Sequence, residues 1–160
     1  MAILTSEDET IKSFVEIKLL HDSLKNKSEF SWIPYSLKLL SADVNLQYES
    51  PAKNKGAGDY VFALKPINEL EELLKGLKNF LLNPELKNYF FEPVEPSFEI
   101  TFERSYRGFS VYFWIDAGNV ISDHYSWDGF GLRFFTSEEK IKSFTKELSK
   151  EMEMLFSKNA

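Results

Sequence analysis

The sequence contains no cysteine and only two histidines among its 160 residues. Without cysteine the chain has no disulfide, no thiolate nucleophile and no sulfur-ligated zinc. No apolar run approaches the roughly 18–20 residues that a membrane-spanning helix needs. The start, MAILTSEDET, lacks the basic and apolar regions of a secretory signal. These absences predict a soluble, cytoplasmic protein.

Basic residues are also in deficit: 19 Lys and Arg stand against 25 Asp and Glu, a net charge of −6. Neutralising the phosphates of nucleic acid or of an anionic membrane needs clustered Lys and Arg. We therefore expect neither nucleic acid nor membrane as a partner. An acidic balance attracts a basic partner, although an excess of this size is also ordinary for solubility.

Aromatic residues are abundant, at 16% of the chain, with 15 phenylalanines, and hydrophobic residues make up 43%. A chain of this length buries roughly 70% of the surface that its unfolded form exposes, which is enough for a core without cross-links. Aromatic side chains suit the pleated, half-buried surface of a sheet. We expect a single domain over residues 1–160 that is rich in sheet.

The N-terminal segment 1–35 carries the least decisive pattern. Ser6 and Glu9 have the spacing of a capping box, and the apolar residues that follow fit one helical stripe. The letters VEIKL at 15–19 alternate as a strand does. Residues 6–25 therefore fit either structure; the length of the periodic segment and its start signal favour a helix. The stretch 26–36 then reads as a loop interrupted by Pro34.

The rest of the chain alternates between strand and helix signals. Two alternating runs occupy 36–49 and change phase near residues 41–43, which suits a bulge or bend. A helix capped by Asn68 ends at Asn83, and the box Thr136–Glu139 opens a C-terminal helix. Further strands are expected at 60–65, 97–103, 109–116 and within 120–135, where Asp128-Gly129 favours a hairpin. This order predicts an α+β fold: an antiparallel sheet of about five strands with two or three helices packed on it.

Candidate catalytic groups are few. His124 stands beside Asp123 and near Ser126, the residue types of a hydrolase triad. Adjacent strand residues point to opposite faces, so Asp123 cannot orient His124 as a triad acid does. The nucleophile elbow G-x-S-x-G is also missing.

The carboxylates do not form a catalytic or metal-binding pattern either. Glu99 and Glu103 share a strand face but lie about 13 Å apart at about 3.3 Å per residue, farther than the pair of a glycosidase. No metal-ligand spacing occurs in the sequence. GAGD at 56–59 precedes a strand, whereas phosphate loops precede a helix. We expect no catalytic residue, no metal and no cofactor, and hence a protein that is not an enzyme.

The pattern that indicates an exposed interaction surface is stronger than any catalytic pattern. In SFEITFE (97–103) the apolar positions alternate with polar ones, so one face of the strand points to a core and the other to solvent. The same phase on the next strand places aromatic side chains outward. Such a face, with aromatic anchors inside a charged rim, is typical of a protein interface. A covering helix would instead make Trp114 part of a second core. The candidate partner-binding residues are Glu99, Glu103, Tyr112, Trp114 and Trp127, with Arg133 in a compatible phase.

Residues 60–156 resemble the small immunity proteins of the WapI type, which protect a bacterium against the toxin of its own contact-dependent or wall-associated system. The resemblance is carried by GDYVFALKPINELEELLKGLKNFL (58–81), FFEPVEPSFEITF (90–102), GFSVYFWID (108–116), GLRFF (131–135) and the final amphipathic helix. Its most specific piece is Phe91-Glu92-Pro93 followed by Pro96-x-Phe98-Glu99. The first 35 residues depart from the short N-terminal strand of that family.

The resemblance implies an antitoxin that binds its cognate toxin domain stoichiometrically and occludes the toxin's active site without turnover. It transfers no toxin-contact residue. Many such toxins are nucleases with basic clefts, which an acidic, aromatic-rich surface would suit. The alternative function is a small-ligand or carbohydrate-binding α+β domain that uses Trp114, Trp127 and Tyr112 as stacking platforms.

Overall fold

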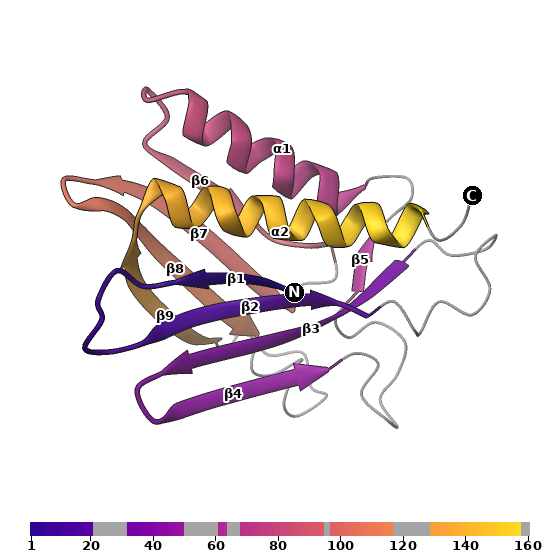
Figure 1. Cartoon of the computed structure of the whole chain (residues 1–160), viewed down its shortest axis with the longest axis horizontal. Helices are drawn as coiled ribbons and strands as arrows, with labels where there is room; N and C mark the ends of the chain where they lie inside the picture. The colour runs from indigo at the N-terminus through magenta and orange to yellow at the C-terminus, as the bar shows by residue number, and fades with distance from the viewer. Residues whose placement is uncertain (21–31, 50–60, 64–67, 95–96, 117–128, 158–160) are drawn as a thin grey trace.

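A computed structural model describes residues 1–20, 32–49, 61–63, 68–94, 97–116 and 129–157 of the chain. These residues form nine strands and two helices, in an α+β arrangement of antiparallel sheets with helices (Figure 1). The α+β class and the antiparallel pairing are as expected from the sequence. In the described residues the strands form two sheets rather than one.

The first sheet has the strand order β1-β2-β3-β4, and β5 pairs with the other end of β3. Its strands are β1 (Ala2–Thr5), β2 (Ser13–Leu19), β3 (Trp32–Ser41), β4 (Val44–Glu49) and β5 (Val61–Ala63). Every pairing is antiparallel, and β1 to β4 each pair with their neighbours in the sequence, whereas β5 pairs with β3 and not with β4.

The second sheet has the order β6-β7-β8-β9 and is also antiparallel throughout. Its strands are β6 (Asn88–Phe91), β7 (Phe98–Ser105), β8 (Gly108–Asp116) and β9 (Gly129–Thr136). The two sheets meet where β1 and β9 end. There the Glu7 amide donates to the Phe135 carbonyl at 2.8 Å, and the Thr136 hydroxyl donates to the Thr5 carbonyl at 2.8 Å.

Helices α1 (Glu69–Leu82) and α2 (Glu138–Ser157) lie side by side across the sheets (Figure 1). Asn68 caps α1 as expected, because its side chain accepts a hydrogen bond from the Glu71 amide at 3.2 Å. For α2 the capping residue is Ser137, one position after the expected Thr136, whose hydroxyl is turned to β1 instead. Neither described helix is long and apolar enough to cross a bilayer.

One hydrophobic core joins both sheets and both helices. Alternate residues of β7 and β8 face it, and Phe109 of β8 packs edge-on against Phe80 of α1 with ring centroids 5.7 Å apart. Tyr35 of β3 contacts Phe98 of β7 in the same way at 5.8 Å. Six residues on the apolar phase of β7, β8 and α2 are at most 2% exposed: Phe98, Ile100, Phe102, Val111, Phe113 and Leu148.

The favoured helix over residues 6–25 is wrong where the chain is described, because 13–19 form strand β2. The Ser6 hydroxyl accepts from the Ser13 amide at 3.2 Å and so closes a turn instead of capping a helix. The Asp8 carboxylate accepts from the Thr10 amide at 2.8 Å and tightens the same turn. A capping-box spacing can thus belong to a β1–β2 turn.

The expected loop at 26–36 is wrong from residue 32 onward, where β3 begins. Pro34 lies inside this strand, opposite Val61 of β5. The Pro34 carbonyl still accepts a hydrogen bond from the Leu20 amide at 2.9 Å. The sheet therefore lacks only the hydrogen bond that a backbone N–H at this position would donate. The phase change at 41–43 is a two-residue hairpin turn between β3 and β4, with Ala42 at a φ of 50°.

Gly76 of α1 is a position where a larger residue has no room. A Cβ built there would lie 2.3 Å from ring atoms of Tyr89, whose hydroxyl donates to the Leu73 carbonyl at 3.3 Å. Burial, and then the charge of Glu72, raise the pKa of Tyr89 to about 12, which accords with a ring held against the helix.

We therefore expect Gly76→Ala to destabilise the protein. Alanine normally stabilises a helix interior by about 0.5–1 kcal/mol relative to glycine. Here the clash with Tyr89 should reverse the sign and cost about 1–2 kcal/mol, as overpacking does. Chemical denaturation measures the change. In a Tyr89→Ala background the same substitution should become stabilising, and a stabilising Gly76→Ala in the natural background would contradict this reading.

Candidate partner-binding face

The second sheet has a face that points away from the helices, which we call the outer face. It follows from the strand phase: the residues of β7 and β8 that alternate with the core positions are half-buried or exposed, apart from Ser110, which is 8% exposed. The outer face consists of Phe90, Glu99, Thr101, Glu103, Ser110, Tyr112, Trp114, Asp116, Arg133 and Phe135, with Glu92 just beyond β6.

Four of the five candidate residues from the sequence lie on this face, and the cross-strand register sets them in rows. Glu99 is opposite Trp114, and Glu103 is opposite Ser110 on the same pair of strands. Tyr112 stands between Thr101 of β7 and Arg133 of β9. The fifth candidate residue, Trp127, lies outside the described residues.

Trp114 is not covered by a helix in the described part of the chain. Its side chain is 44% exposed, and both helices contribute to the core on the opposite side of the sheet. Phe90 and Phe135 on the same face are 53% and 44% exposed. Exposed aromatic residues gathered on one sheet face, rather than scattered singly, indicate an interaction surface.

Gly131 of β9 leaves room for the Trp114 ring, and Gly129 lies at ordinary contact distance from it. A Cβ on Gly131, directly opposite Trp114, would lie 2.4 Å from indole atom Cε3, and one on Gly129 would lie 3.5 Å from the same atom. The indole therefore lies against the bare backbone of β9. One side of the ring is supported by the sheet, and the residue still keeps a large exposed area.

Acidic groups outnumber basic groups on the outer face. Glu92, Glu99, Glu103 and Asp116 carry negative charge, against Arg133 alone. Burial raises the pKa of the Glu92 carboxyl, and repulsion from Glu99 and Asp116 raises it further. The negative charge of the outer face therefore favours a positively charged partner.

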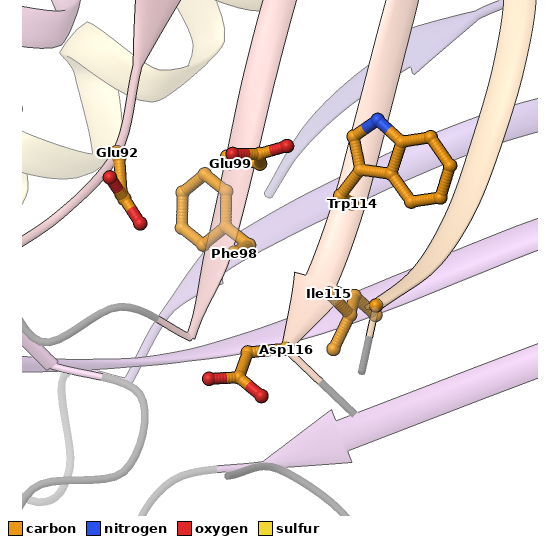
Figure 2. A pocket seen from close by; sticks show the side chains of 7 residues that line it. Glu92, Phe98, Glu99, Trp114, Ile115 and Asp116 are labelled. Carbon is orange, nitrogen blue, oxygen red and sulfur yellow. The ribbon is translucent and has the colours of Figure 1, made fainter. Parts of the chain in front are cut away.

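A hollow of about 240 Å³ opens where β7 begins and β8 ends, lined by Glu92, Phe98, Glu99, Trp114, Ile115, Asp116 and Gly129. In Figure 2, Glu99 lies between Glu92 and the Trp114 indole, and Asp116 stands at the end of β8. Aromatic, aliphatic and acidic groups thus meet at one place. No basic residue is among the described residues that line it.

The other candidate sites add no chemistry within the described residues. His21, Asp123, His124 and residues 56–59 lie outside them. Glu99 and Glu103 both lie on the outer face of β7, each opposite a residue that is not acidic. Among the described residues, no group of three His, Cys, Asp or Glu side chains is arranged to hold a metal ion.

Sequence reasoning missed several outer-face residues. Phe90 and Glu92 belong to β6 and its end, a strand that the sequence analysis did not expect. The places of Phe135 and Gly131 on this face follow only from the β8–β9 register, which sets Gly131 opposite Trp114. Neither NYFFE nor GLRFF alternates strictly, because apolar residues are adjacent in both, so local pattern alone does not give the phase of these strands.

No protein-family model, curated protein or solved structure matches this chain. The resemblance to WapI-type immunity proteins therefore stays a prediction from the sequence.

Proposed function

We propose that this protein is an immunity protein that binds a cognate bacterial toxin domain through the outer face of the β6–β9 sheet. It acts by stoichiometric occlusion of the toxin and turns over no substrate. The observation that carries the proposal is the uncovered outer face, which combines three exposed aromatic side chains with four carboxylates. The resemblance of residues 60–156 to WapI-type proteins points the same way.

The chemistry of the outer face favours a protein partner with a basic surface. Tyr, Trp and Phe are enriched at the centre of protein interfaces, and charged groups form the rim. The excess of carboxylates would steer a positively charged partner and disfavour an acidic one. A toxin that cleaves nucleic acid has a basic, phosphate-binding cleft, so a nuclease domain is the partner whose charge fits best.

The alternative, a carbohydrate- or small-ligand-binding domain, would use the same aromatic residues. The hollow beside Trp114 measures about 240 Å³, and pockets for drug-sized ligands are usually about 300–1,000 Å³. Trp114 and Tyr112 lie on an open sheet face rather than within a deep cleft. These features favour a large, flat partner over a small enclosed ligand.

Toxin and immunity genes of such systems lie next to each other, and this arrangement supplies the direct test. The C-terminal domain encoded by the reading frame directly upstream of this gene is produced in bacteria with and without this protein. We expect that domain to stop growth alone, growth to be restored by co-production, and the two chains to co-purify in a fixed ratio. A folded protein that neither restores growth nor forms the complex would refute the proposal.

The carboxylates should act mainly on the encounter with the toxin. For the double variant Glu99→Gln/Glu103→Gln we expect slower association, on the order of tenfold at low ionic strength, because charge steering as a whole changes association rates by about 10–10³. Dissociation should change little unless the Glu99 carboxylate bonds directly to the partner. The salt dependence of association should flatten, since these charges are exposed to screening. Stopped-flow kinetics across a salt series measures both rates.

Glu85→Gln is the matched control for this charge change. Glu85 is exposed and lies in the turn after α1, next to Leu86, whose carbonyl accepts from Arg104 at the far end of β7. Its removal should leave the association rate and the salt slope as they are. Because the double variant removes two charges and Glu85→Gln removes one, an equal slowing per charge removed would assign the effect to net charge rather than to the outer face.

A further inference from the structure

The hollow where β7 begins and β8 ends combines two features that both bind cations. One wall is the indole of Trp114, and the others carry the carboxylates of Glu92, Glu99 and Asp116 (Figure 2). A volume of about 240 Å³ is smaller than a usual drug-sized pocket and suits one side chain.

The indole is held in place before any ligand arrives. Gly131 leaves room for the ring to lie on the β9 backbone, and any Cβ there would displace it, being 2.4 Å from Cε3. A ring supported on one side, and still 44% exposed, has an accessible surface for stacking. Trp is the aromatic side chain that attracts cations most strongly through its face.

Glu92 and Glu99 share the hollow with no Lys, Arg or His among the described residues that line it. Glu99 stands on β7 directly opposite Trp114, so its carboxylate and the indole border the same space. The raised pKa of Glu92, caused by burial and then by Glu99 and Asp116, reports mutual repulsion that a bound cation would relieve.

We propose that this hollow is a binding pocket for the guanidinium group of an arginine side chain presented by the protein partner. A planar guanidinium can stack on the Trp114 indole while its edge donates paired hydrogen bonds to a carboxylate. A lysine ammonium satisfies the charge but neither stacks nor donates in that plane. The identity of the partner as a toxin rests on the proposed function; the chemistry of the pocket does not.

The test uses the whole protein labelled with ¹⁵N and a single-residue probe, N-acetyl-arginine amide. The indole N–H resonance of Trp114 is assigned by its disappearance in Trp114→Phe. We expect saturable shifts of this resonance and of the Glu99 and Asp116 amides, with a dissociation constant on the order of 1 mM or weaker, as befits one side chain. N-acetyl-citrulline amide, which has nearly the same shape but no charge, should give no saturable shift, and N-acetyl-lysine amide should bind more weakly.

Substitutions in the hollow test whether the resonance shifts arise from arginine bound there. Glu99→Gln should weaken arginine binding by about tenfold, a typical loss for one charge-assisted hydrogen bond. Gly131→Ala should weaken it too, by displacing the indole, while Glu85→Gln should leave it unchanged. Equal shifts with citrulline, an equal loss in Glu85→Gln, or no saturable shift at tens of millimolar would overturn the proposal.

The two proposals fail separately because the titration contains no toxin. If arginine binds but growth is not restored in the co-production test, the pocket stands and the immunity function falls. If growth is restored but arginine does not bind, the toxin is held by the rest of the outer face and the arginine pocket is refuted.

Discussion

Replacing Phe102 by alanine should lower the free energy of unfolding by about 3–5 kcal/mol, the usual cost of deleting a fully buried phenyl ring. Phe102 is 0% exposed, points into the core from the middle of β7, and lies opposite Val111 of β8. Its ring also stacks on Tyr89 of β6, with centroids 6.4 Å apart. Three strands would therefore lose contacts around one cavity.

Thr101→Ala is the matched control for this experiment. Thr101 precedes Phe102 on the same strand, but its side chain lies on the outer face and is half-buried. Its truncation should cost less than about 1 kcal/mol, as surface substitutions do. Urea denaturation of both variants gives the comparison. Similar losses at 101 and 102 would mean that β7 does not separate a buried face from an outer one.

The parts of the fold that the sequence predicted are those with strong local signals. Helix α1 has a cap at Asn68 and an apolar stripe, of which Leu70, Leu73 and Leu77 are buried. The alternation in 97–103 likewise gave the phase of β7, since a period of two decides which side chains share a face. Local pattern was sufficient in both cases.

The N-terminal half shows where local pattern fails. Strand β2 is held by β1 on one side and β3 on the other, and the residues that pair with it are up to 28 positions away. Serine and aspartate, the residue types of Ser6 and Asp8, are common both at helix caps and in turns, because their side chains accept backbone hydrogen bonds in either setting. Only pairing with distant residues decides between the two, and the sequence pattern does not contain that information.

The candidate site likewise combines residues that local pattern predicts with residues that it does not. The outward phase of Glu99, Glu103, Tyr112 and Trp114 was readable from alternation along single strands. The hollow was not, because it needs Glu92 from beyond β6 and Gly129 from β9 beside them. Registers between strands bring these residues together, and register depends on the whole sheet.

Trp114→Ala should speed dissociation from the cognate toxin by about 30- to 700-fold, equivalent to roughly 2–4 kcal/mol if the indole is the anchor of the interface. Association should change little, because an aromatic anchor acts after encounter whereas charges act on approach. The indole is 44% exposed in the free protein, and truncating it should cost little stability, which thermal unfolding can verify. Surface-binding kinetics with the immobilised toxin domain gives both rates.

Two further variants make the result specific to the position of the ring. Gly131→Ala keeps Trp114 but pushes its indole off the β9 backbone, so it should reproduce part of the faster dissociation. Val44→Ala truncates a side chain that is 51% exposed on the other sheet and should leave the kinetics unchanged. If Trp114→Ala dissociates at the natural rate, the toxin docks elsewhere on the molecule. If Gly131→Ala matches the full loss, the orientation of the indole, and not only its area, holds the complex together.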